Sequence, residues 1–227
     1  MSSTVSRRQA RPASLEVRPA ATAELDRTAR LHARTLPEGF FARLGARFLR
    51  RYHHAFAASP QAEVLVARDR NHPAGMLVGT YDNAAHYRWV AHHRARRLAL
   101  AGLAALLQRP RLAAEFVVTR TGRYARALGR FVRGRAVGAS ASEPQEPDRV
   151  AVLTHVAVDP AAQGAGVGRS LVGEFVERAR RAGADEVRLI TPADGPGPEF
   201  YRSLGWRHLR VRRAADGTVV EEFVLPL

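Results

Sequence analysis

The spacing of apolar residues changes several times along the first 81 residues, and each spacing predicts one type of element. Residues 15–18 alternate apolar and polar side chains as a short strand does, whereas apolar residues at three- and four-residue intervals predict helices over 22–35 and 37–59. Two further apolar runs, 63–68 and 75–81, flank a turn that contains Asp, Asn and Pro, which is typical of a β-hairpin. The expected order is therefore strand, helix, helix, strand, strand.

A second succession of elements follows residue 148. A β-branched apolar run over 149–158 precedes a glycine-rich turn, a helical pattern over 166–181 and another apolar run at 187–190. Strand, turn, helix and strand in this order form an α/β crossover unit, in which the two strands are parallel. After this unit we expect a short helix at 199–204 and two strands at 206–213 and 218–225.

The character of the sequence changes between these two regions. Residues 86–135 contain twelve Arg against one acidic residue, and they predict two helices broken at Pro110. Residues 138–148 are rich in Pro, Ser and acidic residues, a composition typical of a mobile linker. Because the remaining residues suffice for one compact domain, we predict a single domain over 14–227, interrupted at 82–148 by a cationic helical insertion and linker.

The composition excludes several kinds of chemistry. The 227 residues contain no Cys, which excludes thiol nucleophiles, disulfides and Cys-ligated metal centres. All 36 basic residues are Arg, so lysine Schiff bases and a Walker-type phosphate lysine are excluded, and the formal net charge is +15. Residues 1–13 are basic and polar without the apolar run of a secretory signal. We therefore expect a disordered basic tail and a cytoplasmic protein.

The turn after the run at 149–158 carries the clearest candidate chemistry. Gly164, Gly166 and Gly168 precede a helix, where unpaired backbone N–H groups and the helix dipole favour a phosphate or pyrophosphate. Glycine suits such a turn because it has no Cβ to hold the anion away from the backbone. The last two glycines are two residues apart, whereas a dinucleotide-binding turn needs three, and the Lys of a Walker loop is missing. Both nucleotide interpretations are weakened.

This turn and a segment downstream of it resemble the GCN5-related N-acetyltransferase (GNAT) superfamily. The acetyl-CoA loop of that superfamily reads Q/R-x-x-G-x-G/A, and residues 163–168 read Gln-Gly-Ala-Gly-Val-Gly. Asp194 stands where members often carry Asn, and Tyr201 follows seven residues later, ahead of a Leu-Gly-Trp turn. The resemblance is specific over 150–206. It implies an α/β (α+β) fold of the GNAT type, with a mixed, mostly antiparallel central sheet flanked by helices.

The resemblance also implies how acetyl-CoA is held. The fourth and fifth strands of the superfamily splay apart, so that the pantetheine amides pair with the free edge of one strand and the loop amides hold the pyrophosphate. The implied cofactor-binding residues of this chain are Val156, Ala157, Val158, Gln163, Gly164, Ala165, Gly166, Val167, Gly168, Arg169 and Asp194. The implied co-substrate is acetyl-CoA, and no metal ion is expected.

The implied reaction is direct attack of a neutral primary amine on the thioester, which needs no enzyme nucleophile. Tyr201 is the implied acid for the leaving thiolate. The fifth strand offers no Glu, which several relatives use as the base, and His155 is the nearest titratable replacement. Because neighbouring strand residues point to opposite faces, we expect only one of Thr154 and His155 to face the cleft. Glu38, His53 or water are the alternative bases.

Several of these positions have a second interpretation. Asp194 cannot donate a hydrogen bond as the usual Asn amide does, and it is equally interpreted as a helix cap. Glu38 and Phe40 lie where the superfamily lines its acceptor pocket, and helix packing is the alternative there. His53 and His54 are adjacent in the predicted helix, so they point to different sides and do not bind one metal ion together.

The predicted function is that of an acetyl-CoA-dependent N-acetyltransferase whose acceptor is a small-molecule or peptide amine, for example an amino sugar. The cationic insertion is interpreted as a solvated lid on the core, as a surface for an anionic membrane, or, less favoured, as a surface for nucleic acid. The alternative function is a non-catalytic module of the same fold, whose insertion binds membrane or nucleic acid. The sequence predicts neither the acceptor nor the oligomeric state.

Overall fold

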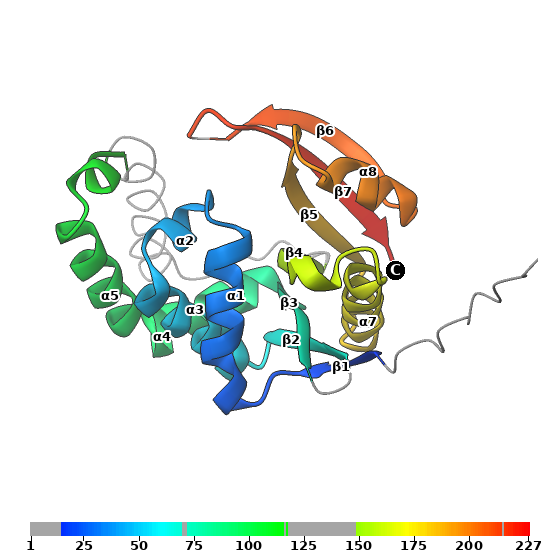
Figure 1. Cartoon of the computed structure of the whole chain (residues 1–227), viewed down its shortest axis with the longest axis horizontal. Helices are drawn as coiled ribbons and strands as arrows, with labels where there is room; N and C mark the ends of the chain where they lie inside the picture. The colour runs from blue at the N-terminus through cyan, green and yellow to red at the C-terminus, as the bar shows by residue number, and fades with distance from the viewer. Residues whose placement is uncertain (1–14, 70–71, 116, 118–148, 215) are drawn as a thin grey trace, which may run out of the picture.

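The structure is a computed structural model, and it describes residues 15–69, 72–115, 117, 149–214 and 216–227. The described residues form one sheet (Figure 1). Its strands are β1 (Leu15–Pro19), β2 (Ala62–Asp69), β3 (His72–Thr80), β4 (Val150–Val158), β5 (Glu186–Pro192), β6 (Arg207–Arg213) and β7 (Val219–Pro226).

The strand order confirms the predicted sheet. It runs β1-β2-β3-β4-β5-β7-β6, and neighbouring strands are antiparallel except β4 and β5. The parallel pair arises from the predicted crossover through the helix that follows the glycine turn. The fold is therefore α/β with a mixed, mostly antiparallel sheet.

The helices lie on both faces of this sheet. They are η1 (Thr22–Glu24), α1 (Leu25–Thr35), α2 (Phe40–Arg43), α3 (Ala46–Ala58), α4 (Asn83–His93), α5 (Ala95–Leu107), η2 (Pro160–Ala162), α7 (Val167–Arg181) and α8 (Gly197–Ser203). Figure 1 shows α1 to α5 gathered on one side of the sheet and α7 on the other.

Each face of the sheet has its own apolar core. On the α7 face, Leu171 and Phe175 pack with Leu153 and Leu189 of the central strands. On the opposite face, aromatic residues of α2 and α3, among them Phe56, pack on β2 and β3. The sheet therefore separates two cores, which are called below the α7 face and the α1–α3 face.

The helix predicted over 37–59 is interrupted in the structure. Residues 37–39 form a turn, and Gly45 separates α2 from α3 with a φ of 92°. An L side chain rarely adopts this φ, and a Cβ on Gly45 would also lie 3.0 Å from the Arg109 guanidinium. The apolar spacing continues across Gly45, which is why the spacing alone predicted one helix.

The described part of the predicted insertion packs on α3. The single helix predicted before Pro110 is wrong, because α4 ends at His93 and α5 begins at Ala95. Ala101 and Ala105 of α5 are buried in the core of the α1–α3 face. Three predicted segments lie outside the described residues: the tail at 1–13, the linker at 138–148 and most of the second helix, of which 110–115 are described and helical.

The predicted insertion has an ion pair with α2 and exposed apolar side chains. Arg43 of α2 forms two hydrogen bonds with Glu115, of 3.0 and 2.6 Å, which join the two segments. Leu100, Leu103 and Leu107 are exposed along α5. No helix among the described residues is long and apolar enough to cross a membrane.

Candidate active site

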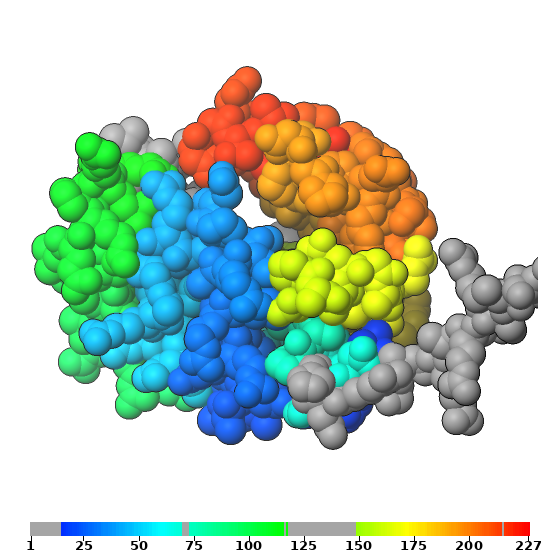
Figure 2. All heavy atoms as spheres, in the orientation of Figure 1, coloured from blue at the N-terminus to red at the C-terminus, as the bar shows by residue number. Residues whose placement is uncertain are grey.

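β4 and β5 separate part-way along their length. Their pairing ends at Leu153 and Leu189, whereas β4 continues to Val158 and β5 to Pro192. β3 pairs with the other edge of β4 as far as Val158. Within the described residues, the edge of 154–158 that faces β5 therefore has no neighbouring strand. Figure 2 shows the surface hollowed between the N-terminal helices, the start of α7 and the β5–β7 region.

A β-bulge lies where the two strands separate. Consecutive residues of β3 pair with His155 and Leu153, so Thr154 is an extra residue in β4. Leu153 and Val156 both pack into the α7 core, although strict alternation would place them on opposite faces. Thr154 and His155 therefore both lie on the α1–α3 side. The bulge interrupts the alternation on which the expectation for Thr154 and His155 rested, and which of them faces the cleft stays a prediction.

The loop that precedes α7 presents backbone amides and open space. Gly164 and Gly166 have φ values of 78° and 79°, and nothing lies within 4 Å of a Cβ added to either. The Ser170 amide donates to the Gly166 carbonyl at 3.0 Å, so the amides of the first helical turn before it have no partner within the helix. Buried Val167 anchors this turn, while Arg169 is exposed. This geometry is that of the predicted anion cradle.

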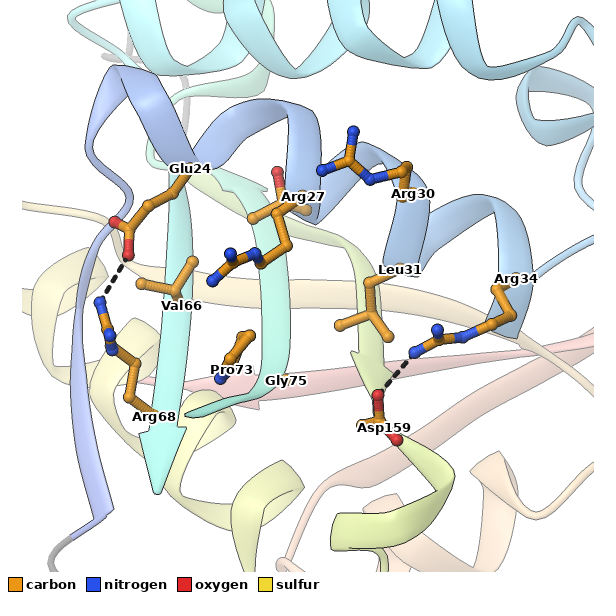
Figure 3. A pocket seen from close by; sticks show the side chains of 11 residues that line it. Glu24, Arg27, Arg30, Leu31, Arg34, Val66, Arg68, Pro73, Gly75 and Asp159 are labelled. Carbon is orange, nitrogen blue, oxygen red and sulfur yellow. Dashed lines mark hydrogen bonds and ion pairs between the residues drawn. The ribbon is translucent and has the colours of Figure 1, made fainter. Parts of the chain in front are cut away.

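An ion pair ties α1 to the beginning of this loop. Asp159 accepts a hydrogen bond from the Ala161 amide at 3.1 Å and pairs with Arg34 at 2.5 Å. Figure 3 shows this pair at the edge of a pocket of about 150 Å³ between α1 and the β2–β3 hairpin. Arg27 and Arg30 also line the pocket, but neither the loop glycines nor His155 does. The pocket is therefore separate from the cleft between β4 and β5.

Tyr201 lies in an aromatic cluster next to the loop. Its ring centre is 5.0 Å from that of Phe200 and 5.5 Å from that of Trp206, and Tyr201 is only 7% exposed. Phe200 in turn lies beside Gly168, where an added Cβ would be 3.3 Å from its ring. Burial raises the pKa of Tyr201 above its usual value of 10. The hydroxyl therefore stays protonated at neutral pH and is suited to donate a hydrogen bond.

Asp194 lies in the exposed turn between β5 and α8. Pro196 is the N-cap of α8, and no side chain caps this helix. The interpretation of Asp194 as a helix cap is therefore wrong, and its role toward the cofactor stays a prediction.

A cluster of imidazoles lies on the α1–α3 side of β4. His32 of α1 and His53 of α3 are buried, and their Nδ1 and Nε2 atoms, respectively, are 3.0 Å apart. His53 Nδ1 is 2.8 Å from the Thr28 hydroxyl. The ring of His155, which is partly exposed, lies 4.4 Å from that of His32, and its Nε2 is 3.3 Å from the Tyr52 hydroxyl.

Burial sets the protonation of this cluster. It lowers the pKa of His32 to about 4 and, with a smaller contribution from His32 and His54, the pKa of His53 to about 3. Burial and the two neighbouring imidazoles also lower the pKa of His155 well below its usual value. All three rings are therefore neutral at pH 7. Because both ring nitrogens of His53 are in hydrogen bonds, His53 is not positioned to take a proton from a substrate directly.

Sequence reasoning missed His32 and Thr28. They lie on one face of α1 at a spacing of four residues, but their partners are on α3 and β4. The amphipathic pattern of 22–35 is the only signal that could have placed them on the inner face of a helix.

Glu38 and Phe40, the two predicted pocket residues, follow His32 closely in the chain but differ in the exposure of their side chains. Glu38 is exposed in the turn between α1 and α2, whereas Phe40 is 8% exposed in the core of the α1–α3 face. Phe41 stacks on Tyr52 with ring centres 5.1 Å apart. The position of Phe40 agrees with the packing interpretation. The role of Glu38 and Phe40 in an acceptor pocket stays a prediction.

In the described ranges, no three His, Asp or Glu side chains are grouped so that they would hold a metal ion.

Comparison with known proteins finds a family for part of the chain. Residues 114–208 match the family of the acetyltransferase (GNAT) domain. This match includes the glycine loop, α7 and the Tyr201 segment, and the solved structures below share the fold. No curated protein matches the chain by sequence.

Solved GNAT structures cover nearly the whole chain at low identity. Ard1 from Thermoplasma volcanium is 12% identical with a TM-score of 0.55, over 94% of this chain and 98% of Ard1. The ribosomal-protein-S18-alanine N-acetyltransferase from Escherichia coli is 14% identical with a TM-score of 0.53, over 93% of each chain. The Salmonella typhimurium protein yncA, solved with its cofactor acetyl-CoA, is 13% identical with a TM-score of 0.53, over 94% of each chain. These likenesses show the fold.

Proposed function

We propose that this protein transfers the acetyl group of acetyl-CoA to a primary amine. The observation that carries the proposal is the separation of β4 from β5 directly beside the glycine loop of α7. The free edge at Val156–Val158 offers backbone partners for the pantetheine amides, and the amides of 164–169 favour a pyrophosphate. The yncA structure, which contains acetyl-CoA, supports the same co-substrate.

The proposed reaction is direct aminolysis of the thioester. The amine nitrogen bonds to the carbonyl carbon, the C–S bond breaks, the amine loses a proton and the CoA thiolate gains one. We assign the amine proton to His155, because it is neutral, partly exposed and next to the separation of the strands. Tyr201 is the proposed hydrogen-bond donor to the thiolate, because its hydroxyl is held protonated beside the loop.

The acceptor is proposed as a class of chemistry only. The Escherichia coli relative is named for an alanine of a ribosomal protein, which is consistent with an amine acceptor. We propose that Glu38, which is exposed in the turn between α1 and α2, contributes to attraction of an ammonium group. The +15 net charge disfavours acceptors that carry many positive charges.

The test is an assay of thiol release from acetyl-CoA with a panel of primary amines, including an amino sugar and a peptide N-terminus. The Tyr201→Phe variant keeps the ring in its aromatic cluster and removes only the hydroxyl. We expect kcat to fall while the Kd for acetyl-CoA stays unchanged. Tyr81→Phe is the control, because Tyr81 stacks on Phe175 on the α7 face and no role in the reaction is proposed for it.

The same assay tests the alternative of a non-catalytic module. Such a module would release no thiol with any amine, and the Tyr201→Phe variant would behave as the wild type. Thiol release that depends on both an amine and the Tyr201 hydroxyl contradicts this alternative.

A further inference from the structure

Three buried groups on the α1–α3 face are not used by the cofactor site. Thr28 is 4% exposed, His32 is 1% exposed and His53 is fully buried, yet their polar atoms are joined by short hydrogen bonds. Buried polar groups of this kind cost free energy unless each hydrogen bond is made in the right direction. Which atom donates in each hydrogen bond therefore tells where each ring carries its proton.

The Thr28 hydroxyl fixes the first direction. Its oxygen lies 2.9 Å from the Leu25 carbonyl oxygen, and a hydrogen atom is needed between two oxygens at this distance. The carbonyl has none, so Thr28 donates its only hydrogen to Leu25. The Thr28 oxygen must then accept from His53, and His53 carries its proton at Nδ1.

The same logic fixes His32. A neutral His53 with its proton at Nδ1 has a lone pair at Nε2, which accepts from His32 Nδ1 at 3.0 Å. His32 is neutral as well, so its single N–H is committed to His53. Its Nε2 therefore carries a lone pair and no hydrogen.

The tautomer of His32 affects the protonation of the neighbouring His155 ring. The rings of His32 and His155 are 4.4 Å apart and inclined by 51°. A positive charge that develops on His155 meets no N–H of His32 in this tautomer. If each hydrogen bond ran in the opposite direction, His32 would carry its N–H at Nε2. The partial positive charge on that hydrogen would oppose protonation of the His155 ring at this distance.

We propose that Thr28, His53 and His32 form a hydrogen-bond relay that fixes the tautomer of His32 and thereby keeps His155 able to accept the proton of the substrate ammonium. The three are positioning residues, and they rest on the proposed function of the cleft. In the proton-transfer step the ammonium N–H bond breaks and His155 gains the proton, which it releases to solvent. The neutral amine then attacks the thioester, and the proton that its nitrogen loses in the attack balances the one that the CoA thiolate gains. The titratable groups that face His155 from the elements packed on it are His32 of α1 and Tyr52 of α3, and His53 faces His32.

The first test reads the tautomers without any substrate. Long-range ¹H–¹⁵N spectra of the histidine rings of the full chain at pH 7 are expected to show His32 and His53 neutral and protonated at Nδ1. The Thr28→Val variant removes the acceptor for His53, and both rings are expected to shift toward the Nε2–H form. Thr28→Ser keeps the hydroxyl and is expected to restore the wild-type spectrum. An Nε2–H form of His32 in the wild type would overturn the relay.

The second test reads the consequence at His155. Butylamine, which is protonated at pH 7, and methoxyamine, which is largely neutral, serve as acceptors with acetyl-CoA. For Thr28→Val we expect kcat/KM with butylamine to fall about tenfold and the acidic limb of its pH profile to move. With methoxyamine kcat/KM should change little. Thr28→Ser should restore the wild-type value with butylamine. Thr35→Val is the matched control, because the Thr35 hydroxyl donates to the Leu31 carbonyl at 2.8 Å on the same helix, as the Thr28 hydroxyl does to Leu25, and is not part of the relay.

The outcomes separate the relay from the proposed function. A wild type that turns over butylamine, with equal loss for both acceptors or no loss in Thr28→Val, overturns the relay alone. A wild type that turns over neither acceptor, nor any amine of the panel above, overturns the proposed function whatever the tautomers are.

Discussion

The two faces of the sheet differ in what they bury. On the α7 face, the buried side chains around Leu171 and Phe175 are apolar or aromatic apart from Glu63 of β2, which pairs with Arg178 of α7 at 3.6 Å, and the candidate chemistry lies in backbone amides of the loop. On the α1–α3 face, His32, His53 and His86 are buried together with the apolar core. The first face therefore depends mainly on packing and backbone conformation and buries one paired carboxyl group, whereas the second buries several imidazoles and depends on their protonation.

The largest expected effect is that of acid, which should destabilise the α1–α3 face more than the α7 face. Burial lowers the pKa of His32, His53 and His86 to about 4, 3 and 4, from 6.5 in the unfolded chain. Their stabilising contribution is present above pH 6.5 and is lost as the pH falls toward 4. Between pH 7.5 and 5, the free energy of unfolding should fall by about 2 kcal/mol for each of them. Urea unfolding at both pH values measures this.

Hydrogen exchange tells whether this loss is confined to one face. Amides of α3 should lose protection at pH 5 before those of α7, after correction for the pH dependence of intrinsic exchange. His54→Ala is the control, because His54 is adjacent to His53 but partly exposed. Equal stability at pH 5 and 7.5 would contradict buried, neutral imidazoles.

Packing on the α7 face is tested by Gly79→Ala. The added Cβ would overlap two ring carbons of Phe175, which is fully buried, and would lie 3.1 Å from the Val152 carbonyl oxygen. We expect the free energy of unfolding to fall by about 1–3 kcal/mol, because neither ring nor strand has room to move. The matched change on the other face is Gly102→Ala in α5, where the Cβ is 3.7 Å from the Phe48 ring. It should stabilise the protein by about 0.5–1 kcal/mol.

Backbone conformation at the loop is tested by Gly166→Val. Nothing lies within 4 Å of an added Cβ, so the change acts mainly through the φ of 79°. A left-handed conformation costs an L residue about 1–2 kcal/mol, so we expect acetyl-CoA to bind about tenfold more weakly. Gly173→Ala in α7, also with open space around it, should leave the affinity unchanged. Calorimetric titration of both variants measures the difference; equal affinities would contradict the assigned loop.

The smallest effect is expected where α1 begins. Glu24 pairs with Arg18 and Arg68 at 2.8 and 3.0 Å, and it accepts from the Ala21 amide. The hydrogen bond from Arg18 lowers the pKa of Glu24 to about 2. Its contribution is full above pH 4.5 and is lost as the pH falls through 2. Glu24→Gln should therefore cost about 1 kcal/mol at pH 7.

The destabilisation by Glu24→Gln should depend on pH, and this dependence is the control. The difference between wild type and Glu24→Gln in thermal unfolding should shrink below pH 3. Exposed Glu16 offers a matched site, and Glu16→Gln should change the stability little. Equal effects of the two substitutions would contradict the role of the ion pairs of Glu24.

The C-terminal elements were predictable because their signals are local. The parallel crossover, the loop of 163–168 and the helix after it follow from residues that are close in sequence. The break at Gly45 was not predictable, since the apolar spacing on either side fits one continuous helix, and only the backbone shows the φ of 92°. The bulge at Thr154 depends on how β4 meets β3, which no local pattern contains.

The candidate site was predictable only in its backbone part. The glycines predicted the open loop before α7, and Tyr201 was proposed by resemblance; their roles toward acetyl-CoA stay predictions. The relay joins Thr28, His32 and His53 to His155, which is more than one hundred residues away in the chain. Neither composition nor spacing brings these residues together, because it is the sheet that places α1 and α3 against β4.

The central claim is that the cleft between β4 and β5 binds acetyl-CoA. A calorimetric titration of the full chain with acetyl-CoA, beside NAD as a control and at low and high salt, tests it most directly. The account predicts saturable binding of one acetyl-CoA per chain that survives added salt, with no comparable binding of NAD. Equal and weak binding of both compounds, lost at high salt, would show only attraction to the +15 net charge and would contradict the claim.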